Sequence, residues 1–130
     1  MPTKTAETIT DRWLKSKVKL AAKEKVLERG YFWHRVSGPY SEQGRLYLTA
    51  TRLIWLRAAL NLPVGPSQVE VPLDEVTRVE KRRSAAILWR HELVVTTRDG
   101  REHSFVPFQL VESVDTWLEA IAGALGADNG

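Results

Sequence analysis

Three histidines, His34, His91 and His103, are the side chains best suited to move a proton or to bind a metal near neutral pH. They lie on separate segments that the local sequence predicts to be strands, and none has the HxH or HExxH spacing of a metal site. His91 is followed by Glu92, but neighbouring residues of a strand point to opposite faces, so they cannot form an acid–base couple. We therefore expect no metal here and interpret the histidines as surface or hydrogen-bonded core residues.

The sequence also lacks the motifs of other catalytic chemistries. It contains no cysteine, which excludes disulfides, thiolate catalysis and cysteine-ligated zinc. It contains no P-loop, no GxGxxG motif and no GxSxG elbow. Asp74 and Glu75 are adjacent in an expected turn, where carboxylates are more typical as capping groups than as a catalytic pair. We expect a protein that is not an enzyme and that needs no cofactor.

Clusters of basic residues are the candidate binding features that the sequence contains. The formal net charge is +3, and residues 1–30 hold eight Lys/Arg against four Asp/Glu. This basic N-terminal segment is either a solvated helix face or a surface for anionic partners. The densest run extends from Arg78 to Arg83, in which Lys81, Arg82 and Arg83 are consecutive. Such a run could contact anionic lipid, form a protein-binding edge, or protect an edge strand from aggregation.

Five tryptophans could in principle stack on bases or sugars. Three of them, Trp55, Trp89 and Trp117, fall on faces that the hydrophobic pattern predicts to be core, so packing explains them. The sequence has no RNP or other nucleic-acid motif. We therefore do not expect nucleic acid as a partner.

No apolar run approaches the roughly 18 residues that a membrane-spanning helix needs. The segment Met1 to Ile9 is polar and lacks the apolar region of a secretory signal. The absence of cysteine fits a reducing compartment. We expect a cytoplasmic protein, with a peripheral position at the membrane as the alternative.

A chain of 130 residues fits one domain. Residues from about 10 to 29 favour helix and end before Gly30, which predicts an N-terminal basic helix. We divide the chain into this tail, 1–29, and a domain, 30–126. Alternation and β-branched residues predict about seven short strands, the sixth being either one strand or two joined by a bulge: 31–37, 45–50, 52–57, 69–71, 76–82, 85–97 and 101–106.

The turns and the last helix complete the expected order of elements. We expect a turn at residues 37–44, tight hairpins at residues 50–51 and 99–100, and an apolar loop at residues 58–68. Helical spacing from about residue 113 to 125 predicts an amphipathic helix between Ser113 as N-cap and Gly126 as stop. This order indicates an α+β, mainly β, antiparallel barrel or sandwich that a C-terminal helix caps, with Trp117 as the wedge. The core candidates are Leu46, Leu48, Leu53 and Trp55.

The segment Gly44–Leu56, with the sequence GRLYLTATRLIWL, resembles the signature of GRAM domains, which belong to the PH-like superfamily. Residues 71–79 resemble the next strand pair of that family, residues 93–108 its final hairpin, and the Trp117 helix its capping helix. The resemblance covers residues 24–125 and suggests a bacterial-type single-domain member. It implies a seven-stranded barrel with a C-terminal helix that binds phosphoinositides, other lipids or proteins and has no catalytic residues.

The resemblance also implies where a lipid headgroup would bind, since PH-like domains use the loops after strands one, three and six. The first of these loops, residues 37–44, has no Lys or Arg and contains Glu42, which counts against the usual lipid mode. The other loops could hold an anionic headgroup between Arg57, Arg98 and Arg101, with Leu60 and Leu62 dipping into lipid. The alternative is that these leucines fold back over the barrel and that the arginines are solvated.

The function that the sequence supports best is a non-catalytic binding module for protein–protein interaction or scaffolding. The alternative is a peripheral membrane module that binds anionic lipid or phosphoinositide headgroups. The identity of the partner, the oligomeric state and the pathway stay open at this level. The candidate binding residues are Arg57, Leu60, Leu62, Lys81, Arg82, Arg83, Arg98 and Arg101.

Overall fold

The computed structural model describes residues 8–9, 18–21, 24–37, 40–58, 68–83, 91–107 and 114–129. These residues form short and long strands, a 3-10 turn and one α-helix. In chain order the elements are β1 (Thr8–Ile9), β2 (Val18–Lys19), β3 (Val26–Ser37), β4 (Tyr40–Thr49), β5 (Arg52–Arg57), β6 (Gln68–Pro72), η1 (Leu73–Glu75), β7 (Val76–Arg83), β8 (His91–Thr97), β9 (Glu102–Pro107) and α1 (Val114–Asn129).

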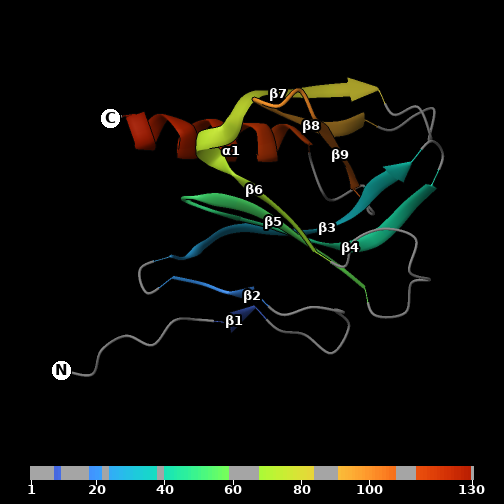
Figure 1. Cartoon of the computed structure of the whole chain (residues 1–130), viewed down its shortest axis with the longest axis horizontal. Helices are drawn as coiled ribbons and strands as arrows, with labels where there is room; N and C mark the ends of the chain where they lie inside the picture. Colours follow the sequence, from blue (N-terminus) through green and yellow to red (C-terminus); the bar gives the residue numbers. More distant parts are fainter. Residues whose placement is uncertain are drawn as a thin grey trace.

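Seven strands form one antiparallel sheet in the order β6-β5-β4-β3-β9-β8-β7. The long strand β3 joins its two halves, because it pairs with β4 along most of its length and with β9 at residues 32–34. The sheet curls so that β7, β8 and β9 lie across from β4, β5 and β6, and α1 lies beside β7 and β8 (Figure 1). The predicted mainly-β antiparallel architecture with a C-terminal helix is therefore confirmed.

The core lies between the two halves of the sheet and α1. Trp117 is fully buried, and its ring meets Phe32 edge to face with 5.2 Å between the ring centroids. The predicted role of Trp117 as the wedge of the capping helix is thus confirmed, and so are the four predicted core residues. The buried cluster comprises Phe32, Leu46, Leu48, Leu53, Trp55, Val71, Leu73, Leu93, Val95, Phe105, Val114, Trp117, Ile121 and Ala124.

Gly44 lies in β4 under the indole ring of Trp55. A Cβ atom at this position would come within 2.5 Å of Trp55 Cε2 and would also meet the carbonyl oxygen of Leu56. The indole lies flat enough against the backbone for its Nε1 to donate a hydrogen bond of 3.2 Å to the carbonyl oxygen of Phe32. Glycine at this position therefore lets the buried Trp55 side chain reach over β4 to the backbone of β3.

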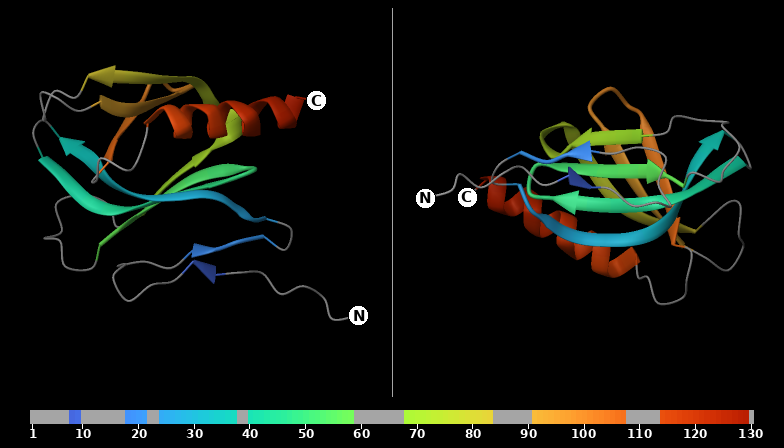
Figure 2. Two further views of the ribbon diagram at one scale, coloured as in Figure 1. Left: turned by 180° about the vertical axis from the view of Figure 1, so that it is seen from behind. Right: turned by 90° about the horizontal axis from the view of Figure 1, so that it is seen from below.

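The predicted N-terminal helix is wrong for the residues that the structure describes. Val18–Lys19 is strand β2, which pairs with β1, and residues 26–29 are the start of β3, which crosses the predicted domain boundary. Val18 and Leu20 pack on Tyr47, Ile54 and Leu56, on the face of β4 and β5 that points away from the main core. Figure 2 shows β1 and β2 covering this face. Tertiary burial of these apolar side chains outweighs the preference of the neighbouring residues for helix, because helix propensity contributes little energy per residue.

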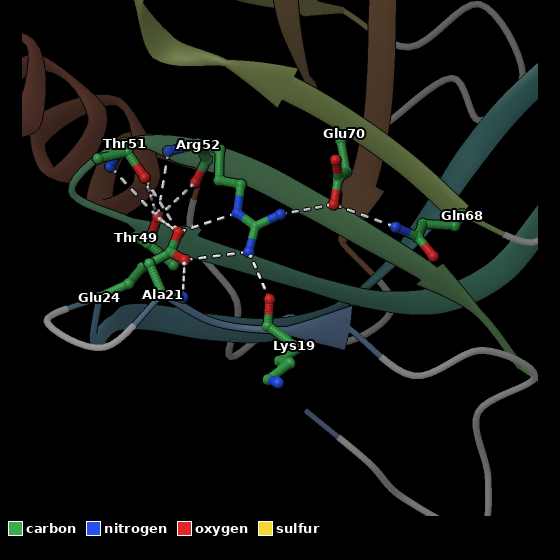
Figure 3. A network of polar contacts seen from close by, with 8 residues as sticks. All are labelled: Lys19, Ala21, Glu24, Thr49, Thr51, Arg52, Gln68 and Glu70. Carbon is green, nitrogen blue, oxygen red and sulfur yellow. Dashed lines mark hydrogen bonds and ion pairs between the residues drawn. The ribbon is translucent and has the colours of Figure 1, made fainter. Parts of the chain in front are cut away.

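A polar network fastens this N-terminal segment to the sheet (Figure 3). Glu24 accepts hydrogen bonds from Arg52 Nε at 2.9 Å and from the hydroxyl of Thr49 at 2.6 Å. Arg52 Nη2 donates to the carbonyl oxygen of Lys19 at 2.9 Å, so one guanidinium binds both β2 and Glu24. Burial alone would raise the pKa of Glu24, but the hydrogen bonds from Arg52 and Thr49 lower it to about 2. The carboxylate therefore stays charged throughout the neutral range.

Two further sequence predictions need correction at element ends. The expected turn at residues 37–44 is mostly strand, because Tyr40 to Gly44 belong to β4 and pair with β3. The α1 helix continues past Gly126 to Asn129, so Gly126 does not stop it. Ser113 and residues 85–90 lie outside the described residues. The hairpins at residues 50–51 and 99–100 are confirmed, and Gly100 has the positive φ that its turn requires.

Candidate functional site

Arg57 is the last residue of β5 and lies on the inner face of the sheet. It is 5% exposed, and its Nη1 lies 3.6 Å from Oε2 of Glu42, which is equally enclosed. Glu42 comes from the segment of β4 that the sequence predicted to be a loop. A guanidinium that is buried against a carboxylate is not available to a headgroup in solvent. The structure therefore gives Arg57 a structural partner inside the barrel.

His34 lies next to this pair, and His103 lies beside His34. His34 is opposite Glu42 in the β3–β4 register, and its ring centroid lies 4.8 Å from that of Trp55 and 6.5 Å from that of His103. Burial, together with the charge of His103, lowers the pKa of His34 to about 4. The His34 ring is therefore neutral at pH 7, and burial also lowers the pKa of His103. Within the described residues, no group of three or more His, Asp or Glu could hold a metal ion.

The third histidine shows the predicted separation of faces on a strand. His91 is exposed at the start of β8, whereas Glu92 is 1% exposed and lies 3.6 Å from Arg35. Burial raises the pKa of Glu92, against the lowering effect of Arg35. His91 and Glu92 therefore do not come together in one site.

Arg98 and Arg101 belong to the turn between β8 and β9, and both are exposed. Asp99 organises this turn, because it accepts hydrogen bonds from the Thr97 hydroxyl and from the backbone N–H of Arg101. The backbone N–H of Arg98 donates to Glu75 of η1, and η1 is itself bonded to the β4–β5 hairpin at Thr51. Arg57 is at the other end of β5, about 16 Å along the strand from that hairpin. The structure therefore does not bring Arg57 together with Arg98 and Arg101.

The basic run Lys81-Arg82-Arg83 forms the exposed end of β7, which extends one residue beyond the expected strand 76–82. Lys81 faces α1 and lies 3.1 Å from Asp115, at the start of that helix. Arg82 faces the other way and is held by Glu80 at 2.5 Å and by Glu102 at 3.0 Å. Arg83 is exposed, and no carboxylate among the described residues lies within ion-pair distance of it. The three cations are thus divided between two faces, and two of them are already compensated.

A groove that the sequence did not predict lies between β7 and α1, at the start of the basic run from Arg78 to Arg83. It encloses about 370 Å³ and is lined by Val76, Thr77, Arg78, Val79, Leu118, Ala122 and Leu125. Its walls are mostly apolar because helical spacing places three small or aliphatic side chains of α1 opposite two valines of the strand. Strand β7 is the last strand of the sheet in the described part of the chain. The groove therefore combines an apolar floor with an open strand edge.

The remaining candidates, Leu60 and Leu62, lie outside the described residues. The groove could not have been predicted from one sequence, because its residues alternate with core residues on both elements. The one available signal was the apolar helix position Leu118, which the helical pattern had already assigned to the core.

Comparison with known proteins identifies the fold. The model of the GRAM domain family matches residues 13–122. The chain has no match among proteins of curated function. No helix in the described part of the chain is both long and apolar enough to cross a membrane.

Solved structures give the same architecture. The chain is similar to the C-terminal domain of an unknown protein from Leishmania infantum, with 19% identity, a TM-score of 0.59 and coverage of 80% of this chain and 86% of that one. It is also similar to the DH/PH domains of p115-RhoGEF, at 18% identity and a TM-score of 0.56, covering 81% of this chain and 31% of that one. The DH/PH domains of PDZ-RhoGEF in complex with activated RhoA match at 16% identity and a TM-score of 0.55, with 82% and 31% coverage. The chain thus spans about a third of the length of the DH/PH fragments and shares a PH-like fold with them.

Proposed function

We propose that this chain, which belongs to the GRAM domain family, binds a protein partner and acts as a non-catalytic interaction module. GRAM and PH-like domains are in general binding modules for lipids or proteins. The choice between these two classes rests on the basic residues, since a headgroup site needs several uncompensated cations that converge on one point.

The observation that carries the proposal is the burial of Arg57 against Glu42. It removes one of the three arginines, Arg57, Arg98 and Arg101, that could together have held an anionic headgroup. Lys81 and Arg82 form ion pairs with carboxylates on the exposed surface, and Arg98 and Arg101 lie at the opposite end of β5 from Arg57. The cationic pattern therefore favours a protein surface over a phosphoinositide pocket. The solved structure of the PDZ-RhoGEF DH/PH domains with RhoA is consistent with a protein-binding role for this fold.

The test is direct binding to a purified protein. Proteins that crosslink to the chain in its host are identified, expressed and titrated against it by calorimetry. The proposal expects at least one partner with saturable 1:1 binding and a Kd in the micromolar range or below. It is contradicted if every crosslinked protein fails to bind when purified while the chain binds anionic vesicles.

The second candidate function is a peripheral membrane module that binds anionic lipid. The exposed cations Arg83, Arg98 and Arg101 favour it, together with the net charge of +3. Non-specific attraction of vesicles by dispersed surface cations is weak, and it is screened within about 8 Å at physiological salt. A membrane function must therefore be distinguished from this attraction. It predicts vesicle binding that needs anionic lipid and that persists at physiological salt.

A further inference from the structure

We propose that a partner protein docks through an acidic surface on the outer face of β3 and β4, the side of these strands that points away from the main core. This inference rests on the proposed protein-binding function and gives that function a location and a partner chemistry. Side chains alternate between the two faces of a strand, and this alternation brings exposed and half-buried residues together here. We call the set the aromatic–basic face, and it comprises Arg29, Tyr31 and Trp33 of β3 with Gln43 and Arg45 of β4.

The register between β3 and β4 makes these side chains neighbours. Phe32 of β3 is buried in the core, so Tyr31 and Trp33, which flank it in the chain, point outward. Tyr31 is opposite Arg45, and Trp33 is opposite Gln43. Side chains that are directly opposite each other on adjacent antiparallel strands are close enough to touch. The two rings and the two β4 side chains therefore form one patch.

The composition of this patch is typical of the centre of a protein interface. Tyrosine, tryptophan and arginine are the residue types that most often dominate binding energy at such interfaces. The rings of Tyr31 and Trp33 are half-buried, so the sheet positions them while part of each stays accessible. The guanidinium carbon of Arg45 lies 4.9 Å from the centroid of the Tyr31 ring and 5.7 Å from that of the Tyr47 ring. Because stacking restricts the arginine in advance, a partner that binds it loses less conformational entropy.

The N-terminal segment borders the aromatic–basic face. Val18 and Leu20 pack on Tyr47 and on apolar side chains of β5, on the same side of the sheet. Figure 2 shows β1 and β2 over β4 and β5, with β3 extending beyond them. Arg29 is opposite Tyr47 in the register and is exposed at this border. Strands β1 and β2 thus cover the apolar part of the outer face, and a partner meets its aromatic and basic part.

The charge of the face favours an acidic partner. Glu28 and Glu42 are opposite the inward-facing Leu48 and His34 in the register, so neither carboxylate points to the outer face. Arg29 is exposed and forms no ion pair with a carboxylate of the described residues, unlike Lys81 and Arg82 of β7. An acidic surface would compensate this charge. Two copies of the chain that docked face to face would instead bring like charges together.

Aromatic rings between arginines can also stack on the bases of a single-stranded nucleic acid. Such a strand is held by a row of cations that follows its backbone. The next arginine on this side of β3 does not extend the row, because Arg35 lies 3.6 Å from the buried carboxylate of Glu92. The observations therefore favour a protein partner over a nucleic acid.

The first experiment places the photo-crosslinking amino acid p-benzoylphenylalanine at position 43 of the full chain, which is expressed in its host. The same amino acid at position 98 is the control, because Arg98 is exposed in the β8–β9 turn. Each protein that crosslinks only from position 43 is purified and titrated against the original chain by calorimetry. The proposal expects an acidic protein that binds 1:1 with a Kd in the micromolar range or below.

Two matched pairs of variants locate the binding of that purified protein. Gln43→Glu adds a negative charge to the aromatic–basic face, whereas Gln43→Lys adds a positive one. Arg29→Glu reverses a charge on the face, whereas Arg98→Glu reverses an exposed charge in the β8–β9 turn. Gln43→Glu and Arg29→Glu should each weaken binding roughly tenfold or more. Gln43→Lys should bind as tightly as the original chain or more tightly, and Arg98→Glu should bind unchanged. Thermal unfolding confirms that all four variants fold.

The outcomes separate this inference from the proposed function. If a purified partner binds Gln43→Glu and Arg29→Glu as tightly as the original chain, the location is overturned while the protein-binding function stands. If no crosslinked protein binds when purified, this inference fails together with that function. Oligo(dT) is the nucleic-acid probe, and binding of it that Arg29→Glu abolishes would replace the protein partner with a nucleic acid. A dimer that Arg29→Glu abolishes would replace the acidic partner with a second copy.

Discussion

Arg57 Nη1 lies 3.6 Å from Glu42 Oε2 at the end of the barrel, and both side chains are almost fully enclosed. Replacing either residue leaves the other charge buried with less compensation. We predict that Arg57→Met lowers the free energy of unfolding by about 3 kcal/mol, the usual cost of breaking a buried pair. The measurement is urea denaturation followed by tryptophan fluorescence.

The double variant Arg57→Met/Glu42→Met provides the control for this pair. Removing both charges should cost clearly less than the sum of the two single changes, because neither charge is then left behind. Additive costs would show that the two residues do not interact, and Arg57 would again be free for another role.

His34 makes the stability of the domain depend on pH. Its pKa is about 4 in the folded protein and 6.5 in the unfolded chain, so the unfolded state binds a proton first as pH falls. The stability is therefore complete above pH 6.5 and declines as pH falls toward 4, by at most about 3 kcal/mol. The titratable groups beside His34 are His103, whose ring lies 6.5 Å away, and Glu42, which is opposite in the β3–β4 register, and His103 should add a smaller part of the same trend.

The variant His34→Phe tests this prediction because it removes the titrating group and keeps an aromatic ring. Unfolding free energies between pH 4 and 7 should vary less in His34→Phe than in the original chain. The exposed His91 provides the control, and His91→Gln should keep the original slope. An unchanged slope in His34→Phe would refute the assignment.

Glu24 is the residue that holds the N-terminal segment on β4 and β5. We predict that Glu24→Ala lowers stability by about 2 kcal/mol, since it removes several charge-assisted hydrogen bonds. Amide hydrogen exchange at Val18 to Leu20 should become faster than in the original chain. The matched control is Glu70→Ala, because Glu70 also contacts Arg52, at 2.7 Å, but is exposed. It should cost less than about 1 kcal/mol; equal effects of the two changes would contradict the proposed role of Glu24.

Gly44 tests the packing of Trp55. In Gly44→Ala the new methyl group would overlap Trp55 Cε2, so we predict a loss of about 2 kcal/mol and a shift in tryptophan emission. Gly123→Ala places the same methyl group on α1, where no atom lies within 4 Å. It should instead raise stability by about 0.5–1 kcal/mol, since alanine favours helix over glycine. Similar losses at both positions would contradict this explanation.

Local patterns in the sequence predicted the strands from β5 onward, the hairpin turns, the Trp117 helix and the core faces. These elements depend on hydrophobic periodicity and on turn residues, which are both visible within a few neighbouring positions of the chain. They failed at residues 18–29, where helix-favouring lysines and alanines surround Val18 and Leu20. These two side chains are fixed by Tyr47 and Ile54, which are more than 25 positions away in the chain. The Glu24–Arg52 contact has the same long-range character and leaves no local signal.

For the candidate binding residues too, the sequence predicted local structure but not tertiary contacts. Lys81 and Arg82 were correctly placed in a strand and Arg83 just after it, but the ion pairs of Lys81 with Asp115 and of Arg82 with Glu102 depend on the tertiary fold. Arg57 was a headgroup candidate because it precedes the loop after the third expected strand, and its burial against Glu42 depends on the tertiary fold. The β7–α1 groove depends on how the helix sits beside the sheet, and spacing within either element does not determine that.

The measurement that tests the central claim most directly is vesicle co-flotation at low and near-physiological salt, with neutral, anionic and phosphoinositide-containing liposomes. A protein-binding module with internally compensated cations should stay with the soluble fraction at physiological salt on all three, with only weak, salt-sensitive flotation on anionic vesicles at low salt. Flotation at physiological salt that requires phosphoinositide, and that is lost when Lys81, Arg82 and Arg83 are changed to alanine, would contradict the account and establish the membrane function instead.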